Sequence, residues 1–301
     1  MTQNPTITLG AARLRAIPAP DAPKVGSLRY FAIVASIQRA GLDPFSPTLL
    51  SDLTTTEGGN RRRILGSSTK VLKSGKLGVK NVVLYLAPGA DSGVNFCAFA
   101  SPGCLSGCLK SSGHMALAGN GRVRLLKSLY FLLFRADFLS QLDAEVGRLA
   151  KAARRAGMVA AVRLNGTSDI LWERIAGDLM RAHPNVQFYD YTKAPLSSRR
   201  DLPANYHLTF SLSERDDSMG RALAWLRAGH NVAAVVSAKG ATTWTAAKRA
   251  AAGLIGTTWH GFPCIDGDES DVRFWDAPGS WVVLYAKGAA TRDASGFVVR
   301  L

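Results

Sequence analysis

From residue 81 onward, short runs of β-branched and aromatic residues alternate with longer amphipathic segments. These runs predict strands at residues 82–86, 159–164, 186–189, 206–210, 232–236 and 281–285, with a short additional strand at 262–265. Alternation of such strands with helical patterns is typical of βα units and a parallel sheet. The sequence therefore predicts an α/β protein.

Helical patterns separate the predicted strands. Apolar residues recur every three or four positions between Leu125 and Leu149, with Asp137 as a candidate cap of a second helix. We predict further helices at 170–182, capped by Ser168 or Asp169, and at 218–228. These units occupy about 210 residues, fewer than the roughly 250 of a closed eightfold barrel, so we predict a partial or irregular (β/α) barrel. A doubly wound open sheet is the alternative.

The first part of the chain has a different composition. Residues 1–80 mix Pro, Gly, Ser and Thr and carry twelve basic and four acidic side chains. We interpret residues 1–80 as a basic N-terminal extension, with a flexible linker at 57–80, and residues 81–301 as the α/β domain. The whole chain has a net charge of +15. This charge favours contact with a polyanion, and nucleic acid is the predicted partner; a solvated terminus is the alternative.

The pattern of apolar residues along the chain bears on membrane insertion and secretion. No run of apolar residues approaches the roughly 18 to 20 needed to span a bilayer, so we predict no membrane insertion. The first residues lack the pattern of a secretory signal, which predicts a cytoplasmic protein. In a reducing compartment, clustered cysteines favour metal ligands or catalytic thiols over disulfides.

Three cysteines lie in a glycine-rich loop directly after the first predicted strand. Cys97, Cys104 and Cys108 have the spacing C-x6-C-x3-C, and the intervening glycines allow backbone N–H groups to approach sulfur. We predict an iron-sulfur cluster on these residues, most simply a four-iron, four-sulfide (4Fe-4S) cluster. Zinc is the alternative, with His114 or Cys264 as fourth ligand, although only one of the two intervals fits the usual zinc spacing. Buried or redox-active thiols are a third interpretation.

Polar residues follow the predicted strands at their carboxyl ends, where loops of parallel α/β folds converge on one face. We predict that cofactor or substrate is bound by six of them: Asn165, Ser168, Asp169, Asp190, Lys193 and Ser211. For Ser168 and Asp169, helix capping is the alternative. No catalytic residue is predicted.

Charged residues at two further places allow definite expectations. Arg163 lies inside a predicted strand and, if it points inward, needs a paired carboxylate or an anionic ligand. Asp266, Asp268, Glu269, Asp271 and Asp276 crowd a short region near Cys264, which we interpret as an exposed acidic loop, with a divalent-cation site as the alternative.

The cysteine loop on a partial barrel resembles the radical S-adenosylmethionine enzymes, in which three thiolates bind a four-iron cluster and leave one iron open. The usual spacing in that superfamily is C-x3-C-x2-C, and this sequence differs at both intervals. The resemblance implies S-adenosylmethionine as a second cofactor, contacted by residues among the six listed above.

A closer resemblance covers about residues 70–287. The segments 81–88, 163–165 with 168–169, 189–193, 206–211 and 266–271, together with the cysteine loop, are similar to an uncharacterised family of phage and plasmid proteins, the gene-product-eighty-eight-like family. This resemblance implies a mobile-element origin and residence in the host cytoplasm.

Two functional hypotheses follow. The first is an iron-sulfur protein of a phage or mobile element, in its specific form a radical-type enzyme acting on or near nucleic acid. The alternative is a non-catalytic nucleic-acid-binding protein with a structural zinc or iron-sulfur site.

Overall fold

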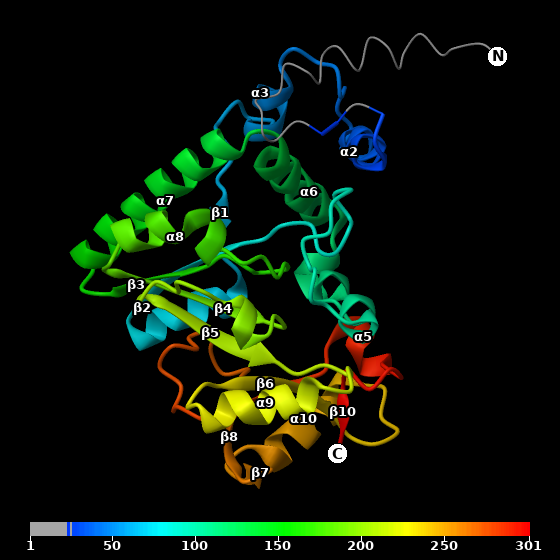
Figure 1. The fold of residues 1–301 in the computed structure, drawn as a ribbon. Helices are drawn as coiled ribbons and strands as arrows, with labels where there is room; N and C mark the ends of the chain where they lie inside the picture. The colour runs from blue at the N-terminus through cyan, green and yellow to red at the C-terminus, as the bar shows by residue number, and fades with distance from the viewer. Residues whose placement is uncertain (1–22, 25) are drawn as a thin grey trace, which may run out of the picture.

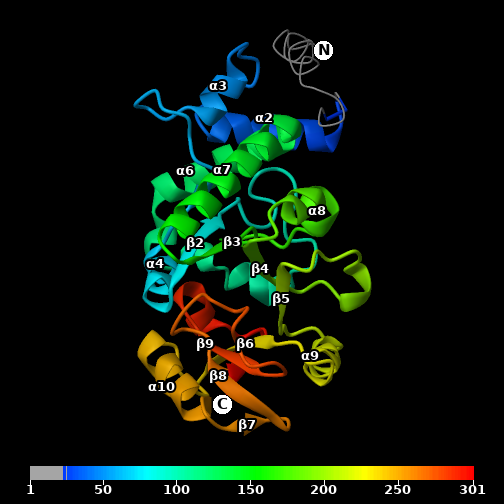
Figure 2. The same ribbon diagram turned by 90° about the vertical axis from the view of Figure 1, so that its left-hand side faces the viewer.

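The computed structural model describes residues 23, 24 and 26–301, and its centre is a ten-stranded sheet. The strands follow the order β1-β2-β3-β4-β5-β6-β9-β8-β7, and β10 pairs with β6 (Figure 2). The path ends at β1 and β7, so the sheet is not closed into a barrel, as predicted. The strands are β1 (Leu65–Gly66), β2 (Val79–Leu84), β3 (Val159–Arg163), β4 (Val186–Thr192), β5 (Tyr206–Ser211), β6 (Val232–Ser237), β7 (Thr258–Trp259), β8 (Phe262–Asp266), β9 (Trp281–Tyr285) and β10 (Val299–Arg300).

The parallel part of the sheet has the order expected of βα units. Strands β2 to β6 are adjacent in chain order and parallel, and β9 and β8 continue the parallel arrangement. All seven strands predicted from the sequence are present, with boundaries shifted by at most three residues. The carboxyl ends of these strands therefore lie on one edge of the sheet.

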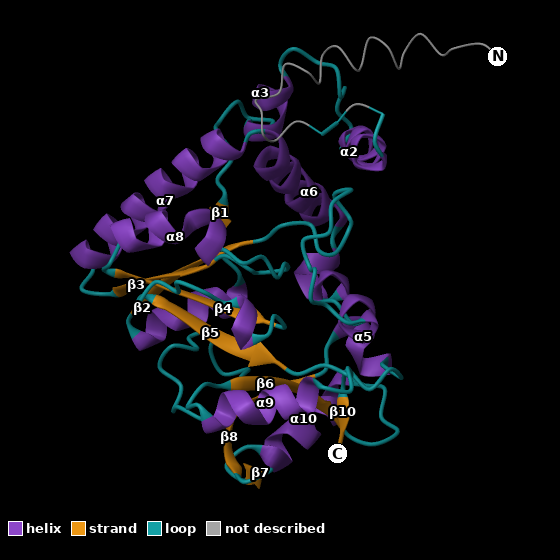
Figure 3. Cartoon of the chain, viewed as in Figure 1, coloured by secondary structure: helices purple, strands orange, loops and turns teal. Residues whose placement is uncertain are grey.

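One face of the sheet is covered by helices (Figures 1 and 3). These are α6 (Ala118–Leu133), α7 (Arg135–Arg155), α8 (Glu173–Ala182), α9 (Ser218–Arg227) and α10 (Trp244–Leu254). Their apolar residues join alternate strand residues such as Val162, Phe188 and Phe210 in one core. Alternation along each strand thus sends apolar side chains to the helices and leaves the other face for different residues.

The predicted helix caps were partly wrong. Helix α8 begins at Glu173, after Trp172, and is not capped by Ser168 or Asp169, because both side chains bond elsewhere. Asp137 lies in the first turn of α7 instead of capping it. Helix α9 ends before Gly229, whose φ of 80° is the left-handed conformation expected after a helix.

The chain before residue 80 is more regular than predicted. It contains α2 (Leu28–Arg39), α3 (Leu49–Thr54), β1, α4 (Thr69–Lys73) and the 3₁₀ helix η1 (Ser74–Leu77), so the predicted flexible linker at 57–80 is wrong. Apolar residues of this segment, including Ile33, Leu53 and Ile64, belong to the main core. The predicted boundary at residue 80 falls inside β2, and residues 1–22 and 25 of the predicted extension lie outside the described residues.

Hydrogen bonds and an ion pair hold basic residues of this segment against the rest of the protein. Arg61 donates to Gln141 and to Tyr130, and it forms an ion pair with Asp137 at 2.9 Å. Arg62 donates to the carbonyl oxygen of Leu53. Basic residues that the sequence suggested were solvated therefore bind groups of the same chain.

The face of the sheet opposite the helices is covered in part by the segment 267–280, which connects β8 to β9. Val272 packs with Val79, Ala161 and Tyr189, and the Phe274 ring lies 5.5 Å from that of Tyr189. This segment was expected to be an exposed acidic loop.

That expectation was wrong because its carboxylates form ion pairs with basic side chains of the protein. The side chains of Asp268, Asp271 and Asp276 are only 10%, 5% and 12% exposed, and they pair with Lys287, Arg163 and Arg273.

Over the described residues, every helix is too short or too polar to cross a bilayer.

Removing the Glu145 carboxylate tests how β1 is held. Its two oxygens accept from the buried backbone N–H groups of Ile64 and Leu65 at 2.9 and 2.8 Å. We expect Glu145→Ala to lower the free energy of unfolding by about 3 kcal/mol, because two buried donors lose their acceptor. Urea unfolding measures this, with Asp178→Ala at a fully exposed side chain as control. Equal effects of the two substitutions would contradict this role.

Candidate functional site

A cavity of about 380 Å³ lies at the carboxyl edge of the parallel strands. Its walls are the loops that follow β2, β3 and β4, the end of β5, part of β9 and of the segment after β8, and residues near the C-terminus. The sequence-predicted residues that line it are Cys97, Cys104, Cys108, Asn165, Ser168, Asp169, Lys193 and Ser211. Convergence of these residues on one cavity is what the strand order predicts.

The cysteine loop is held by local hydrogen bonds. Asn95 Oδ1 accepts from the Cys97 backbone N–H at 2.8 Å, and the Gly89 N–H donates to Cys97 Sγ at 3.2 Å. Cys104 lies in the first turn of α5 (Pro102–Ser106), where Ser101 caps the helix by accepting from the Cys104 N–H. Cys108 precedes the 3₁₀ helix η2 (Leu109–Ser111).

Glu214 links the cysteine loop to the end of β5 by hydrogen bonds. Its carboxylate, three residues after β5, accepts from Ser101 Oγ at 2.5 Å and from the Gly103 N–H at 2.6 Å. Gly103 must lack a side chain here, because a Cβ atom would lie 2.6 Å from Phe297 Cβ and 2.0 Å from Ser295 Oγ. The close packing of α5 on the end of β5 and on the C-terminal segment therefore determines where Cys104 lies.

The thiols of Cys97, Cys104 and Cys108 are wholly or partly shielded from solvent. Burial raises the pKa of Cys97 to about 11, although the Gly89 N–H opposes this shift, and burial also raises the pKa of Cys108. In the free protein Cys97 and Cys108 are therefore protonated at neutral pH, and metal binding would release their protons.

The two candidate fourth ligands lie away from the cavity. Cys264 is 3% exposed and packs in the core on the helix-covered face of the sheet. His114 is exposed on the 3₁₀ helix η3 (Gly113–Ala116) and does not line the cavity. Among the described residues the cavity thus receives three thiols.

Three thiols of one loop supply sulfur donors to the cavity, and the Gly89 N–H is directed at one of them. In a four-iron cluster each thiolate would bind a separate iron, and N–H groups directed at sulfur are common in such sites. Within the described part of the chain, no three His, Cys, Asp or Glu side chains lie close enough to hold one metal ion.

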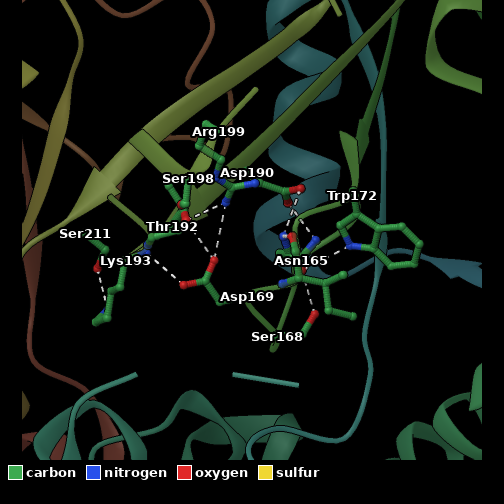
Figure 4. A network of polar contacts seen from close by, with 12 residues as sticks. Asn165, Ser168, Asp169, Trp172, Asp190, Thr192, Lys193, Ser198, Arg199 and Ser211 are labelled. Atoms are coloured by element: carbon green, nitrogen blue, oxygen red, sulfur yellow. Dashed lines mark hydrogen bonds and ion pairs between the residues drawn. The ribbon is translucent and has the colours of Figure 1, made fainter. Parts of the chain in front are cut away.

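Asn165 and Asp190 form the centre of a buried network behind the cavity (Figure 4). Asp190 is fully buried and accepts from the Asn165 backbone N–H at 2.6 Å, from Asn165 Nδ2 and from the Tyr206 hydroxyl. Asn165 Oδ1 accepts from Ser168 Oγ and Trp172 Nε1. Asn165 lines the cavity with both atoms of its amide group hydrogen-bonded within the protein, whereas Asp190 does not line it and supports the loop through Asn165.

Asp169 connects that loop to β4 and to the cysteine loop (Figure 4). Its carboxylate accepts from Thr192 Oγ1 and from the Lys193 backbone N–H, both at 2.8 Å, and lies 3.5 Å from the Arg199 guanidinium. Its own N–H donates to the carbonyl oxygen of Phe96, the residue before Cys97. Burial raises the pKa of Asp169, and these contacts oppose the rise.

Lys193 brings a positive charge to the cavity wall. Its Nζ donates to Ser211 Oγ at 2.7 Å (Figure 4). It also lies 5.2 Å from the centre of the Phe297 ring. Neither contact carries a negative charge. An anionic group of a ligand entering the cavity would find here an ammonium already held in place.

Arg163 lines the cavity and has the carboxylate partner that an inward arginine requires. It points inward and pairs with Asp271 at 3.3 Å, and its guanidinium stacks 4.7 Å from the Tyr191 ring centre. Lys287 is likewise paired, with Asp268. These two pairs neutralise charge inside the cavity, which also receives the Asp169 carboxylate and the Lys193 ammonium.

Several residues of the site were missed by sequence reasoning. Gly166 and Thr167 are examples: a Cβ on Gly166 would lie 2.6 Å from the Tyr85 ring, and the Thr167 carbonyl oxygen lies 3.7 Å from Cys97 Sγ. A glycine in the loop shortly after a strand was the available signal for Gly166.

Substituting Gly103 tests the anchoring of the cysteine loop. We expect Gly103→Ala to lower the free energy of unfolding by about 1 to 3 kcal/mol, since its methyl group overlaps the C-terminal segment. It should also speed the reaction of Cys104 with a thiol reagent. Gly220→Ala in α9, where nothing lies within 4 Å, is the matched control and should not destabilise. A neutral Gly103→Ala variant would refute the packing argument.

The buried Asp190 predicts a pH dependence of stability. Burial raises its pKa from 3.8 to about 7, so the folded state holds a proton that the unfolded state has lost. This group therefore lowers stability as pH rises from about 4 to about 7, by up to about 1.4 kcal/mol per pH unit. Denaturant unfolding across this range should show that slope in the wild type, and Asp190→Asn should remove it. Parallel curves for the two proteins would contradict the assignment.

Comparison with known proteins gives one finding. A family model described as Gene product 88 matches residues 53–301, most of the chain, so the chain belongs to that family. Neither the curated proteins nor the solved structures include a significant match.

Proposed function

We propose that this member of the gene product 88 family is an iron-sulfur protein of the host cytoplasm whose cluster is bound by Cys97, Cys104 and Cys108. One observation carries the proposal: three free thiols from a single loop after the first parallel strand line one cavity. Cys264, the remaining cysteine, packs on the helix-covered face.

The cavity also favours a ligand beside the cluster. Three thiolates leave one iron of a four-iron cluster open, and such a cluster supplies single electrons to a ligand bound there. The chain contributes the rest of the site. Lys193 and Ser211 offer a preorganised ammonium and hydroxyl to a carboxylate, and Asp169 holds the Lys193 backbone.

This arrangement supports S-adenosylmethionine as that ligand and a radical-type reaction as the activity. S-adenosylmethionine carries a carboxylate that suits Lys193, and the cavity volume of about 380 Å³ lies within the usual range for small-molecule sites. Nucleic acid is the proposed substrate class, because the net charge of +15 favours a polyanion. In the non-catalytic alternative the same charge binds nucleic acid and the metal is structural.

Metal analysis tests the proposal. We expect protein purified without oxygen to be brown and to contain iron and sulfide. The colour should be lost in Cys97→Ala, Cys104→Ala and Cys108→Ala. Cys264→Ala is the matched control and should keep the cluster, because this thiol packs in the core. Stoichiometric zinc, or equal iron in all four variants, would refute the proposal.

S-adenosylmethionine turnover tests the role of Lys193. Protein reduced with dithionite should cleave S-adenosylmethionine to methionine and 5′-deoxyadenosine. Lys193→Gln should raise the concentration needed for half-maximal cleavage about tenfold or more, because a charge-assisted contact is lost. Lys76→Gln, at an exposed position on η1, should have no effect. Absence of cleavage by a protein that contains iron and sulfide would leave the non-catalytic alternative.

A further inference from the structure

A second cavity, of about 450 Å³, lies on the other side of the loop that follows β2. It is bounded by α2, by residues 87–91 and by the first turns of α6, and Pro88 lines both this cavity and the one containing the cysteines. Its walls carry the guanidinium groups of Arg39 and Arg124 and the carboxylate of Asp91. No function proposed above uses these residues.

Arg124 is unusual among the buried arginines. Arg199 and Arg273 are also buried, and each has a carboxylate oxygen within ion-pair distance. Over the described residues, none lies that close to Arg124, whose guanidinium donates to Met115 O at 3.0 Å and contacts Met115 Sδ at 3.9 Å. Burial lowers its pKa, yet an arginine keeps its charge. A buried cation without an adjacent anion is costly, so this position favours an anionic ligand.

Arg39 adds a second guanidinium to the same cavity. Although exposed, it is held by hydrogen bonds from Nη2 to Ser36 Oγ at 2.7 Å and to the backbone oxygen of Asp91 at 3.0 Å. The Asp91 carboxylate is itself paired with Lys110 Nζ at 2.8 Å. The charge that remains at the cavity is therefore positive.

The start of α6 also affects the electrostatic potential near this cavity. The helix begins after Leu117 without a side-chain cap, and its first turn contains no acidic residue. Gly121, in the first turns of α6, lines the cavity. Within this first turn no acidic side chain therefore offsets the positive end of the helix dipole.

We propose that Arg39 and Arg124 form a phosphate-binding site at the start of α6. Guanidinium forks match the oxygens of phosphate, and two of them favour a group with several charged oxygens over a single carboxylate. The phosphate belongs either to a soluble phosphorylated compound or to a nucleic-acid backbone. The site is separate from the cysteines, so its test does not require a bound cluster.

Isothermal titration calorimetry on the full chain tests the site with two probes, inorganic pyrophosphate and a short oligothymidylate. We expect Arg39→Gln and Arg124→Gln each to weaken binding about tenfold or more, the loss typical of a charge-assisted hydrogen bond. Arg148→Gln on the exposed side of α7 removes the same charge and should have little effect. Circular dichroism checks the fold of Arg124→Gln, and the exposed Arg39 gives an independent variant.

Each outcome decides the proposal. Selective weakening of pyrophosphate binding supports a soluble phosphorylated ligand, and selective weakening of oligothymidylate binding supports a nucleic-acid backbone. Binding that is absent with both probes, or that is equally affected by Arg39→Gln and Arg148→Gln, overturns it. Neither result depends on iron content, so failure here is distinct from failure of the iron-sulfur proposal.

Discussion

The arrangement of the site depends on the Glu214 carboxylate, which holds a loop more than a hundred residues earlier in the chain. Its bonds to Ser101 and the Gly103 N–H place α5 against the end of β5. Hydrogen bonds to a charged acceptor are each worth about 1.5 to 3 kcal/mol. Cys97 is positioned separately, by the Gly89 N–H and Asn95. Two separate anchors thus set the positions of Cys97 and Cys104 in the wall of the cavity.

Most charged side chains that line the cavity are also bound by partners within the protein. Arg163 and Lys287 each have an aspartate partner from the segment 267–280, so the charges they bring to the cavity are neutralised within the protein. Lys193 has a hydroxyl and an aromatic ring beside it. Lys193 is therefore where we propose that an anionic ligand binds. The cavity lined by Arg39 and Arg124 follows the same reasoning, since among the described residues no carboxylate lies as close to Arg124 as Glu173 lies to Arg199.

The sequence predicted the strands, their parallel arrangement and eight of the residues that line the cavity, because these depend on local periodicity and on the shared direction of parallel strands. It did not predict Glu214 as an anchor, since that role depends on the packing of α5 on β5. Ser168 and Asp169 are residue types that often cap helices. In the structure their side chains instead bond to Asn165 and Thr192, so neither caps α8. The pairing of the acidic segment was not evident for Asp271, because its partner Arg163 lies 108 residues away in the sequence.

The most direct test of the central claim is the Mössbauer spectrum of protein loaded with iron-57 and sulfide without oxygen. If three cysteines hold a four-iron cluster with one open iron, S-adenosylmethionine should change the signal of one iron and leave the other three unaltered. A spectrum of isolated single irons, or of a cluster whose four irons are all insensitive to the addition, would contradict this account.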